Sequence, residues 1–490
     1  MQRNGVLWRR RFGLAAMALL LASAALAAQS IETSTVASRK KLSLTVYNSG
    51  MALVRDTREV TIPEGEVWLR LAGVAEKAEP DTVQMVSVTA PHDLGVLEQS
   101  YSYNPVTLPK LLDAYVGKTI TVVRSRWQNG AVTEEPVQAK LLAANPPVWE
   151  VKGQIVTGLE TQHYIFPSLP SDFYSQPAFT WLLRNHHSGP QTVEASYLTN
   201  GMSWSADYVL VISAAGKLAD LTGWVTLKNE SGASYPDAAL QLIAGHVQRV
   251  YRGGVVGGVP GGVPGAFSDR MMAAQAPAPQ FVQQPFSAYH LYTLARHATL
   301  PDNESKQIRL LGASGVHITR TYEVNGQTYY YRNPEPGAPR HDPVEMHAKF
   351  ENSKANSLGM PLPEGTVRVY QTDSSGLEQL IGEANIQHTP EGETLNLNVG
   401  SAFDVIEERK QTDYQRLSAH SAESSYEVTL RNHQSQSIEV SVNEPFQGDW
   451  RVLNSNFSYE KTSAFSARFK VPVKAGGTAV LKYRVQVRWE

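Results

Sequence analysis

The sequence predicts an all-β protein made of several β-sandwich domains of immunoglobulin-like character, with one small inserted β-barrel. Short segments of alternating apolar and polar residues recur from residue 40 to the end of the chain, which is the period of half-buried strands. The 36 Gly and 28 Pro supply turn formers between these segments. At 490 residues the chain is long enough for two to four domains.

Residues 1–27 are predicted to form a signal peptide. Arg3 and Arg9–Arg11 precede the apolar segment 14–24, and Ala25-Leu26-Ala27 is a small-residue cleavage site. The apolar segment is shorter than the roughly 20 residues that a membrane span needs. We therefore expect a periplasmic or secreted protein, exported by the secretory or the twin-arginine route, with no transmembrane segment after cleavage.

The composition narrows the class of protein. The chain has no cysteine, so disulfides and a lipidated cysteine are excluded. Of the 44 basic residues, four lie in the predicted signal, which leaves 40 against 46 acidic residues and a net charge of −6. This balance argues against nucleic-acid binding.

Residues 40–105 are expected to form an N-terminal β domain. Leu42, Leu44 and Val46 alternate with polar residues, and a turn at Tyr47–Gly50 leads into a return strand.

Residues 106–168 have a different pattern of predicted secondary structure. One short helix is expected over 108–115, followed by strands that pair across Asn129-Gly130, a sequence that favours a tight hairpin turn. Several short strands within so few residues predict a small SH3-like β-barrel.

Residues 175–490 form a continuous predicted β-sandwich region. Its centre is the hairpin-like unit Leu227–Gly245, in which a strand end, a polar turn and a second strand follow one another. A further hairpin is expected at Asn325-Gly326. Residues 251–285 are rich in Gly, Pro and Ala and predict a disordered loop, because they cannot bury enough apolar surface to offset their ordering entropy.

A short pattern with a central asparagine recurs in this region. The four copies are Leu183–Ser188, Leu227–Ser231, Phe350–Ser353 and Leu430–Ser435. Their asparagines are separated by 44, 123 and 80 residues, which is too irregular for a solenoid. We interpret the pattern as one strand-turn-strand solution that is used repeatedly.

Several motifs together resemble a bacterial family of exported proteins. They are Tyr47–Gly50, Gly201–Trp204, Leu227–Gly245 and Val471–Gly477, and the segment from Asn229 to Leu242 is the most diagnostic. This family is defined by a domain of unknown function, which it shares with the mucoidy-inhibitor-like proteins. The heptads typical of that branch are missing from the N-terminal region here. The resemblance implies a fold and export, and it implies no catalytic residues.

One set of residues has the character of metal ligands. His341, Glu345 and His347 share one face of a predicted strand, as zinc ligands can. Pro343 interrupts the strand, and polar residues opposite an apolar face are typical of any half-exposed strand. The glycine-rich segment 253–265 lacks the Lys-Ser/Thr pair of a phosphate-binding loop. We therefore expect no metal site and no cofactor.

Two features leave a carbohydrate-directed function open. Asp207, Asp220, Glu230 and Asp237 flank the central unit, and glycoside hydrolysis needs two carboxylates ~5–10 Å apart. Most tryptophans are expected in the core, and at least one tyrosine of 329–331 is expected at the surface, because the three would alternate along a strand. The aromatic residues considered for sugar stacking are Trp149, Trp181, Trp204, Trp224, Trp450 and Tyr329–Tyr331.

The sequence shows no G-x-S-x-G nucleophile elbow, and Gly312–Gly315 is a turn sequence. We therefore predict a non-catalytic binding or assembly protein of the cell envelope, acting through an exposed sheet edge or the loops at a sandwich end. Its expected partner is an envelope protein or a glycan. The alternative is an envelope hydrolase or carbohydrate-binding protein acting on polysaccharide. The oligomeric state stays open.

Overall fold

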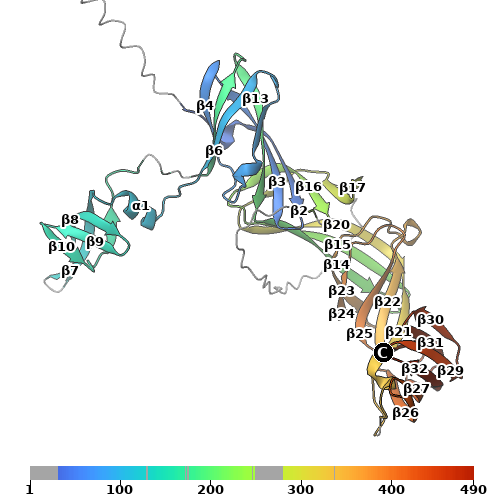
Figure 1. Ribbon diagram of the computed structural model, residues 1–490. Helices are drawn as coiled ribbons and strands as arrows, with labels where there is room; N and C mark the ends of the chain where they lie inside the picture. Colours follow the sequence, from blue (N-terminus) through green and yellow to red (C-terminus); the bar gives the residue numbers. More distant parts are fainter. Residues whose placement is uncertain are drawn as a thin grey trace, which may run out of the picture.

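The computed structural model describes residues 31–489 except 129–130, 171–172, 174–175, 246, 249–279 and 336. The predicted all-β fold is confirmed, because strands dominate these residues (Figure 1). The short helices are α1 (Leu108–Ala114) and the 3-10 helices Val36–Ser38, Pro80–Thr82, Thr328–Tyr331 and Lys354–Asn356. No helix in this part of the chain is long and apolar enough to span a membrane. The predicted signal peptide, the Asn129-Gly130 turn and residues 251–279 of the predicted loop lie outside the described residues.

Five sheets follow one another along the molecule, and we number them in that order. Sheet 1 contains β1 (Ile31–Ser34), β4 (Gly65–Ala72), β12 (Ala178–Asn185) and β6 (Leu94–Ser102). Sheet 2 contains β17 (Phe281–Phe286), β18 (Tyr289–Leu294), β16 (Tyr235–Ala244), β2 (Arg39–Tyr47), β3 (Met51–Thr61), β13 (Pro190–Asn200) and β5 (Gln84–Ser87), and β19 (Ala298–Leu300) also pairs with β16.

The remaining three sheets have the following strand orders. Sheet 3 contains β20 (Glu304–His317), β15 (Leu218–Asn229), β14 (Met202–Ile212), β23 (Gly365–Thr372) and β24 (Glu378–Ile386). Sheet 4 contains β25 (Thr394–Ser401), β22 (Glu345–Glu351), β21 (Thr319–Asn325), β28 (Ile438–Pro445), β31 (Ser466–Val473) and β30 (Tyr459–Ser463). Sheet 5 contains β26 (Val405–Ser418), β27 (Ser421–Asn432), β32 (Thr478–Arg488) and β29 (Asp449–Ser455).

Consecutive sheets pack face to face, so the three inner sheets each take part in two sandwiches. One hydrophobic core runs through sheets 1, 2, 3 and half of sheet 4, and a second core lies between the other half of sheet 4 and sheet 5. Aromatic pairs mark these contacts, for example Phe179 with Tyr197 between sheets 1 and 2, with ring centroids 5.2 Å apart. The resulting array of four sandwiches is extended (Figure 1).

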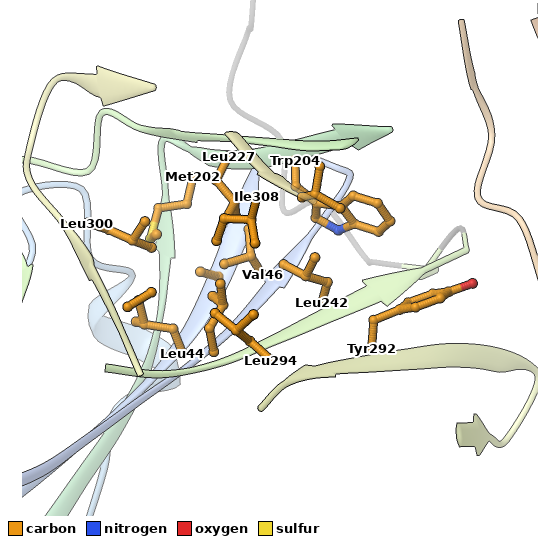
Figure 2. Close-up of a cluster of buried hydrophobic side chains, with 14 of the residues drawn as sticks. Leu44, Val46, Met202, Trp204, Leu227, Leu242, Tyr292, Leu294, Leu300 and Ile308 are labelled. Carbon is orange, nitrogen blue, oxygen red and sulfur yellow. The ribbon is translucent and has the colours of Figure 1, made fainter. Parts of the chain in front are cut away.

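Figure 2 shows the core between sheets 2 and 3. Leu44, Val46 and Leu242 come from two neighbouring strands of sheet 2, and Leu227 and Ile308 face them from sheet 3. All five side chains are at most 2 % exposed. Each such aliphatic side chain contributes about 1.5–3 kcal/mol on burial, so this interface is held by ordinary hydrophobic packing.

In each of the three inner sheets, one parallel strand pair joins the part of the sheet that packs in one sandwich to the part that packs in the next. β2 pairs with β16 in sheet 2, β14 with β23 in sheet 3, and β21 with β28 in sheet 4. All other pairs within these three sheets are antiparallel among the described residues. Adjacent sandwiches are therefore joined by backbone hydrogen bonds as well as by side-chain packing.

Gly365 begins β23 at one of these joints, and we expect Gly365→Ala to weaken it. A Cβ at this position would overlap the carbonyl oxygen of Ala206 on β14. Backbone on both sides must move, which costs about 1–3 kcal/mol. Thermal unfolding of the purified variant should show a lower Tm than wild type. Gly95→Ala is the control, because its nearest neighbour would be 3.9 Å away. An unchanged Tm for Gly365→Ala would contradict the tight joint.

The four recurring asparagines occupy equivalent buried corners, one in each sandwich. Asn185, Asn229, Asn352 and Asn432 are at most 2 % exposed. Each side-chain amide nitrogen donates to three backbone carbonyls, two of which belong to consecutive residues a few positions before a neighbouring strand. Each Oδ1 accepts a backbone N–H from the turn that follows it. The predicted repeated strand-turn-strand solution therefore has a common hydrogen-bond pattern.

A small unit is inserted between β6 and β12 and stands apart from the array (Figure 1). Its strands, in sheet order, are β10 (Gln154–Thr157), β9 (Pro147–Val151), β8 (Ala131–Ala144), β7 (Thr119–Gln128) and β11 (His163–Ile165). α1 confirms the predicted short helix and packs on the sheet through Leu112. The predicted SH3-like barrel is wrong in one respect. No described strand pair joins β10 to β11, so the sheet stays open.

Three predicted local structures differ from the fold. The Leu227–Gly245 unit is not a hairpin, because β15 lies in sheet 3 and β16 in sheet 2, and its turn crosses between the two layers. Asn325-Gly326 forms no tight hairpin turn either, because a 3-10 helix follows it and the antiparallel partner β22 begins only at Glu345. Residues 281–285, at the end of the predicted loop, belong to β17. β16 pairs with the distant strand β2, whereas β17 pairs with β18, the next strand along the chain.

Candidate functional site

The outer side of sheet 3 carries a polar band that crosses all five strands. Because Val225, Leu227, Val367 and Val369 point into the core, the residues between them face outward. From β20 to β24 the band consists of Gln307, Thr226, Asp207, Arg368 and Glu383. We call the outward side of this sheet the sheet 3 face.

Each member of the band contacts the next. Gln307 Nε2 donates to Thr226 Oγ1 at 3.2 Å, and Thr226 Oγ1 donates to Asp207 Oδ2 at 3.0 Å. Arg368 Nη1 lies 3.6 Å from Asp207 Oδ1, and its Nε donates to Glu383 Oε1 at 3.1 Å. The side chains of Asp207, Arg368 and Glu383 are 26, 34 and 53 % exposed, so they keep hydrogen-bonding capacity towards solvent.

Two aromatic side chains lie on the same face. Trp224 is half-buried on β15, in register with Asp207 on one side and Arg309 on the other. Tyr370 is half-buried on β23, in register with Val211. The two rings are two strands apart and four residues apart along the strands, which is about 16 Å.

A shallow depression continues the face beyond β24. It is lined by Glu383 and Asn385 from β24 and by Asn396 and Asn398 from the neighbouring edge of sheet 4, and its volume is about 430 Å³. The two strands approach closely because Gly382 has no side chain: a Cβ there would overlap the carbonyl oxygen of Val399. The polar side chains that line the depression are three amides and one carboxylate.

The sequence predicted binding by strand addition at a sheet edge, but three of the edge strands are interrupted by a bulge or a proline. β6 has a bulge opposite Leu182 and Leu183, and β24 has one opposite Val369 and Tyr370. Pro285 lies in the edge strand β17 and has no N–H to donate. Bulges and prolines are the devices that protect edges from further pairing. The open face of sheet 3 is therefore a better candidate surface than these edges.

The three residues considered as metal ligands, and not expected to form a site, are only partly brought together. His347 and Glu345 lie side by side on β22, with Nε2 3.4 Å from Oε2. His341 lies elsewhere and contacts the backbone oxygen of Glu407 at 2.9 Å. No group of three potential ligands is found among the described residues.

The four flanking acids do not converge. Asp207 and Asp220 both face outward from sheet 3, but four residues separate their levels, which is about 13 Å. Asp220 accepts the backbone N–H of Gly315 at 3.0 Å. Glu230 pairs with Lys228, and Asp237 lies beside His297 with a φ of 46°. Only Asp207 lies within the polar band.

The aromatic predictions hold for some residues and not for others. Trp149, Trp181 and Trp204 are buried, as expected. Trp224 and Trp450 are half-buried instead. Residues 328–331 form a 3-10 helix rather than a strand, in which Tyr329 is 50 % exposed and the next two tyrosines are buried.

A buried ionic cluster in the last sandwich escaped the sequence interpretation. Arg409 Nη1 donates to Glu444 Oε1 at 2.6 Å, and both side chains are fully buried. Tyr331 donates to the other oxygen of Glu444 at 2.5 Å. Arg409 Nε lies 3.3 Å from Glu407 Oε1 and 3.6 Å from Asp342 Oδ2. The pattern of β26 is the reverse of the usual one. The charged residues Glu407 and Arg409 occupy the buried positions, and the apolar Ile406 between Val405 and Glu407 is 39 % exposed.

Burial raises the pKa of Glu407 to about 7, and the nearby Arg409 charge only partly offsets this. Such a pKa suits acid–base catalysis, but the Glu407 side chain is fully buried. We interpret the cluster as part of the sandwich core, where Arg409 also lies over the ring of Tyr330 at 5.2 Å.

Glu407 makes stability depend on pH. Its folded pKa is above its ordinary value of 4.5, so its contribution is fully present below pH 4.5 and is lost as pH rises to about 7. We expect wild type to lose up to about 3 kcal/mol relative to Glu407→Gln across this range. Urea unfolding of both proteins at several pH values measures the difference and cancels other titrating groups. A constant difference between them would contradict the raised pKa.

Neither the protein-family models nor the curated proteins searched match this sequence. Membership of the exported bacterial family therefore stays a prediction.

Proposed function

We propose that the mature chain is an exported, non-catalytic binding protein of the cell envelope, which holds its partner on the sheet 3 face. The observation that carries the proposal is the continuous polar band from Gln307 to Glu383, which lies on a solvent-facing sheet beside the half-buried Trp224. Binding sites combine aromatic side chains with a few polar groups that fix the orientation of the ligand, and both kinds of group are present here.

The array supports this role because it supplies a firm base. The joint between β14 and β23 runs through the centre of the sheet 3 face, from Ala206 to Ile212 on one strand. Beneath it, Tyr208 and Leu210 are fully buried. A face on a packed sheet loses little conformational entropy when it binds, which favours recognition without rearrangement. The predicted signal peptide supports the proposed export to the cell envelope.

Site-specific photo-crosslinking in intact cells tests the proposal. A benzophenone amino acid replaces Thr222, which neighbours Trp224 on the sheet 3 face, or Gln99, which is exposed on β6 of sheet 1. We expect a discrete adduct in the envelope fraction from position 222 and none from position 99. Adding Trp224→Ala should remove it. Equal adducts from both positions, or none from position 222, would overturn the proposal.

A further inference from the structure

We infer that the ligand of the sheet 3 face is an uncharged glycan chain that lies across β15, β14, β23 and β24. This inference rests on the proposed function and adds the chemical class of the ligand. It follows from the spacing of the aromatic rings, the kind of hydrogen-bonding groups between them, and the charge balance of the face.

The aromatic rings mark two ends of an extended site. Trp224 and Tyr370 are two strands apart across the sheet and four residues apart along it, about 16 Å in all, which is too far for one small molecule to touch both. A chain of several sugar units spans this distance and offers each ring the apolar face of a pyranose. Side chains held half-buried on a sheet lose little rotamer freedom on binding.

The groups between the rings match sugar hydroxyls. A hydroxyl donates one hydrogen bond and accepts others, so it needs both kinds of partner close together. Asp207 offers acceptors only and Arg368 donors only, and the two lie 3.6 Å apart. Beyond them, Asn385, Asn396 and Asn398 line the depression, and an amide supplies both functions.

The charge balance selects an uncharged ligand. Beside Trp224 and along the polar band, Arg309 and Arg368 are matched by Asp207 and Glu383, and Arg368 lies between the two carboxylates. A nucleic acid or an acidic polysaccharide needs an excess of positive charge, which these pairs do not provide.

The same residues argue against a protein partner. The centre of a protein–protein interface is depleted of charged side chains, because they must be desolvated. The centre of the sheet 3 face holds Asp207 and Arg368. A glycan leaves such groups hydrated or hydrogen-bonded, so the cost is avoided.

Binding of the mature chain to an array of neutral and acidic bacterial oligosaccharides tests the inference, followed by calorimetry with the retained chains. We expect neutral chains of several units to bind, with an affinity that changes little between about 0.05 and 0.5 M salt. Trp224→Ala should weaken binding at least tenfold, and Trp224→Phe should keep most of it. Trp68→Ala is the control, because Trp68 is a half-buried tryptophan of sheet 1.

Three outcomes would overturn the glycan assignment. They are the absence of any retained chain, a preference for acidic chains, and binding that Trp224→Ala leaves unchanged while circular dichroism shows the fold intact. A protein adduct from position 222, together with no glycan binding, would reject the glycan and leave the proposed function standing. No adduct and no glycan binding would reject both.

Discussion

Arg409→Met is expected to lower the free energy of unfolding of the last sandwich by about 3–5 kcal/mol. The substitution removes the cation that lies 2.6 Å from Glu444 and 3.3 Å from Glu407 in a fully buried site. The carboxylate of Glu444 then stays in the core without an opposite charge, and that desolvation is the main cost. Urea unfolding followed by tryptophan fluorescence measures the loss, since Trp450 lies against this core.

A double variant separates the loss of the Arg409–Glu444 ion pair from the cost of leaving Glu444 buried without an opposite charge. Arg409→Met combined with Glu444→Leu removes both charges and fills the space, so we expect it to recover most of the stability. The surface pair Lys482 and Glu427 provides the control, because its side chains are 64 and 36 % exposed and Lys482→Met should cost less than about 1 kcal/mol. If Arg409→Met and Lys482→Met lowered the free energy of unfolding by the same small amount, the buried cluster would not be a major stabilising feature.

Asn229→Asp is expected to destabilise the second sandwich by about 3 kcal/mol or more. The amide nitrogen of Asn229 donates to the carbonyls of Ala233, Leu300 and Pro301 at 2.8, 3.2 and 2.9 Å. A carboxylate has the same shape but no donor, so it faces three carbonyl oxygens in a buried site. Asn229→Ala should cost less, because it leaves the carbonyls unpaired without adding a buried charge. Thermal and urea unfolding of both variants measure the order.

The exposed Asn396 is the matched control, and Asn396→Asp should leave the free energy of unfolding within about 0.5 kcal/mol of wild type. Asn229→Asp with a similarly small effect would show that the corner is not a stabilising feature. In that case Asn432→Asp should also have only a small effect on the free energy of unfolding, because the amide of Asn432 likewise donates to three backbone carbonyls.

Period and turn chemistry predicted the strands well but not their partners. The alternation of Leu42, Leu44 and Val46 marks the buried face of β2 correctly. It contains no information on β16, which pairs with β2 from about 200 residues further along the chain. The turn at Tyr47–Gly50 joins the paired strands β2 and β3 as predicted, but the segments 227–245 and 325–326 form no tight hairpin. Turn chemistry does not choose the partner of a strand, and the parallel joints close long loops and depend on the packing of whole sandwiches.

The sheet 3 face and the ionic cluster were hidden for different reasons. Trp224 alternates with Gly223 and Val225, so its outward position was present in the pattern, but an apolar neighbourhood favoured the core. The bulge in β24 changes the alternation there, which concealed the outward side of Glu383. In β26 the usual rule is inverted: Glu407 and Arg409 point inward, and Arg409 pairs there with both Glu407 and Glu444.

Hydroxyl-radical footprinting of the mature chain, with and without its envelope ligand, tests the central claim most directly. Oxidation rates of individual side chains report their exposure, and the aromatic residues react readily. Binding through the sheet 3 face predicts protection of Trp224 and Tyr370, with unchanged rates at Trp68 of sheet 1 and at Tyr459 of sheet 4, which is 43 % exposed. Protection at Tyr459 or in the inserted unit, with Trp224 unchanged, would contradict the claim and place the binding surface elsewhere.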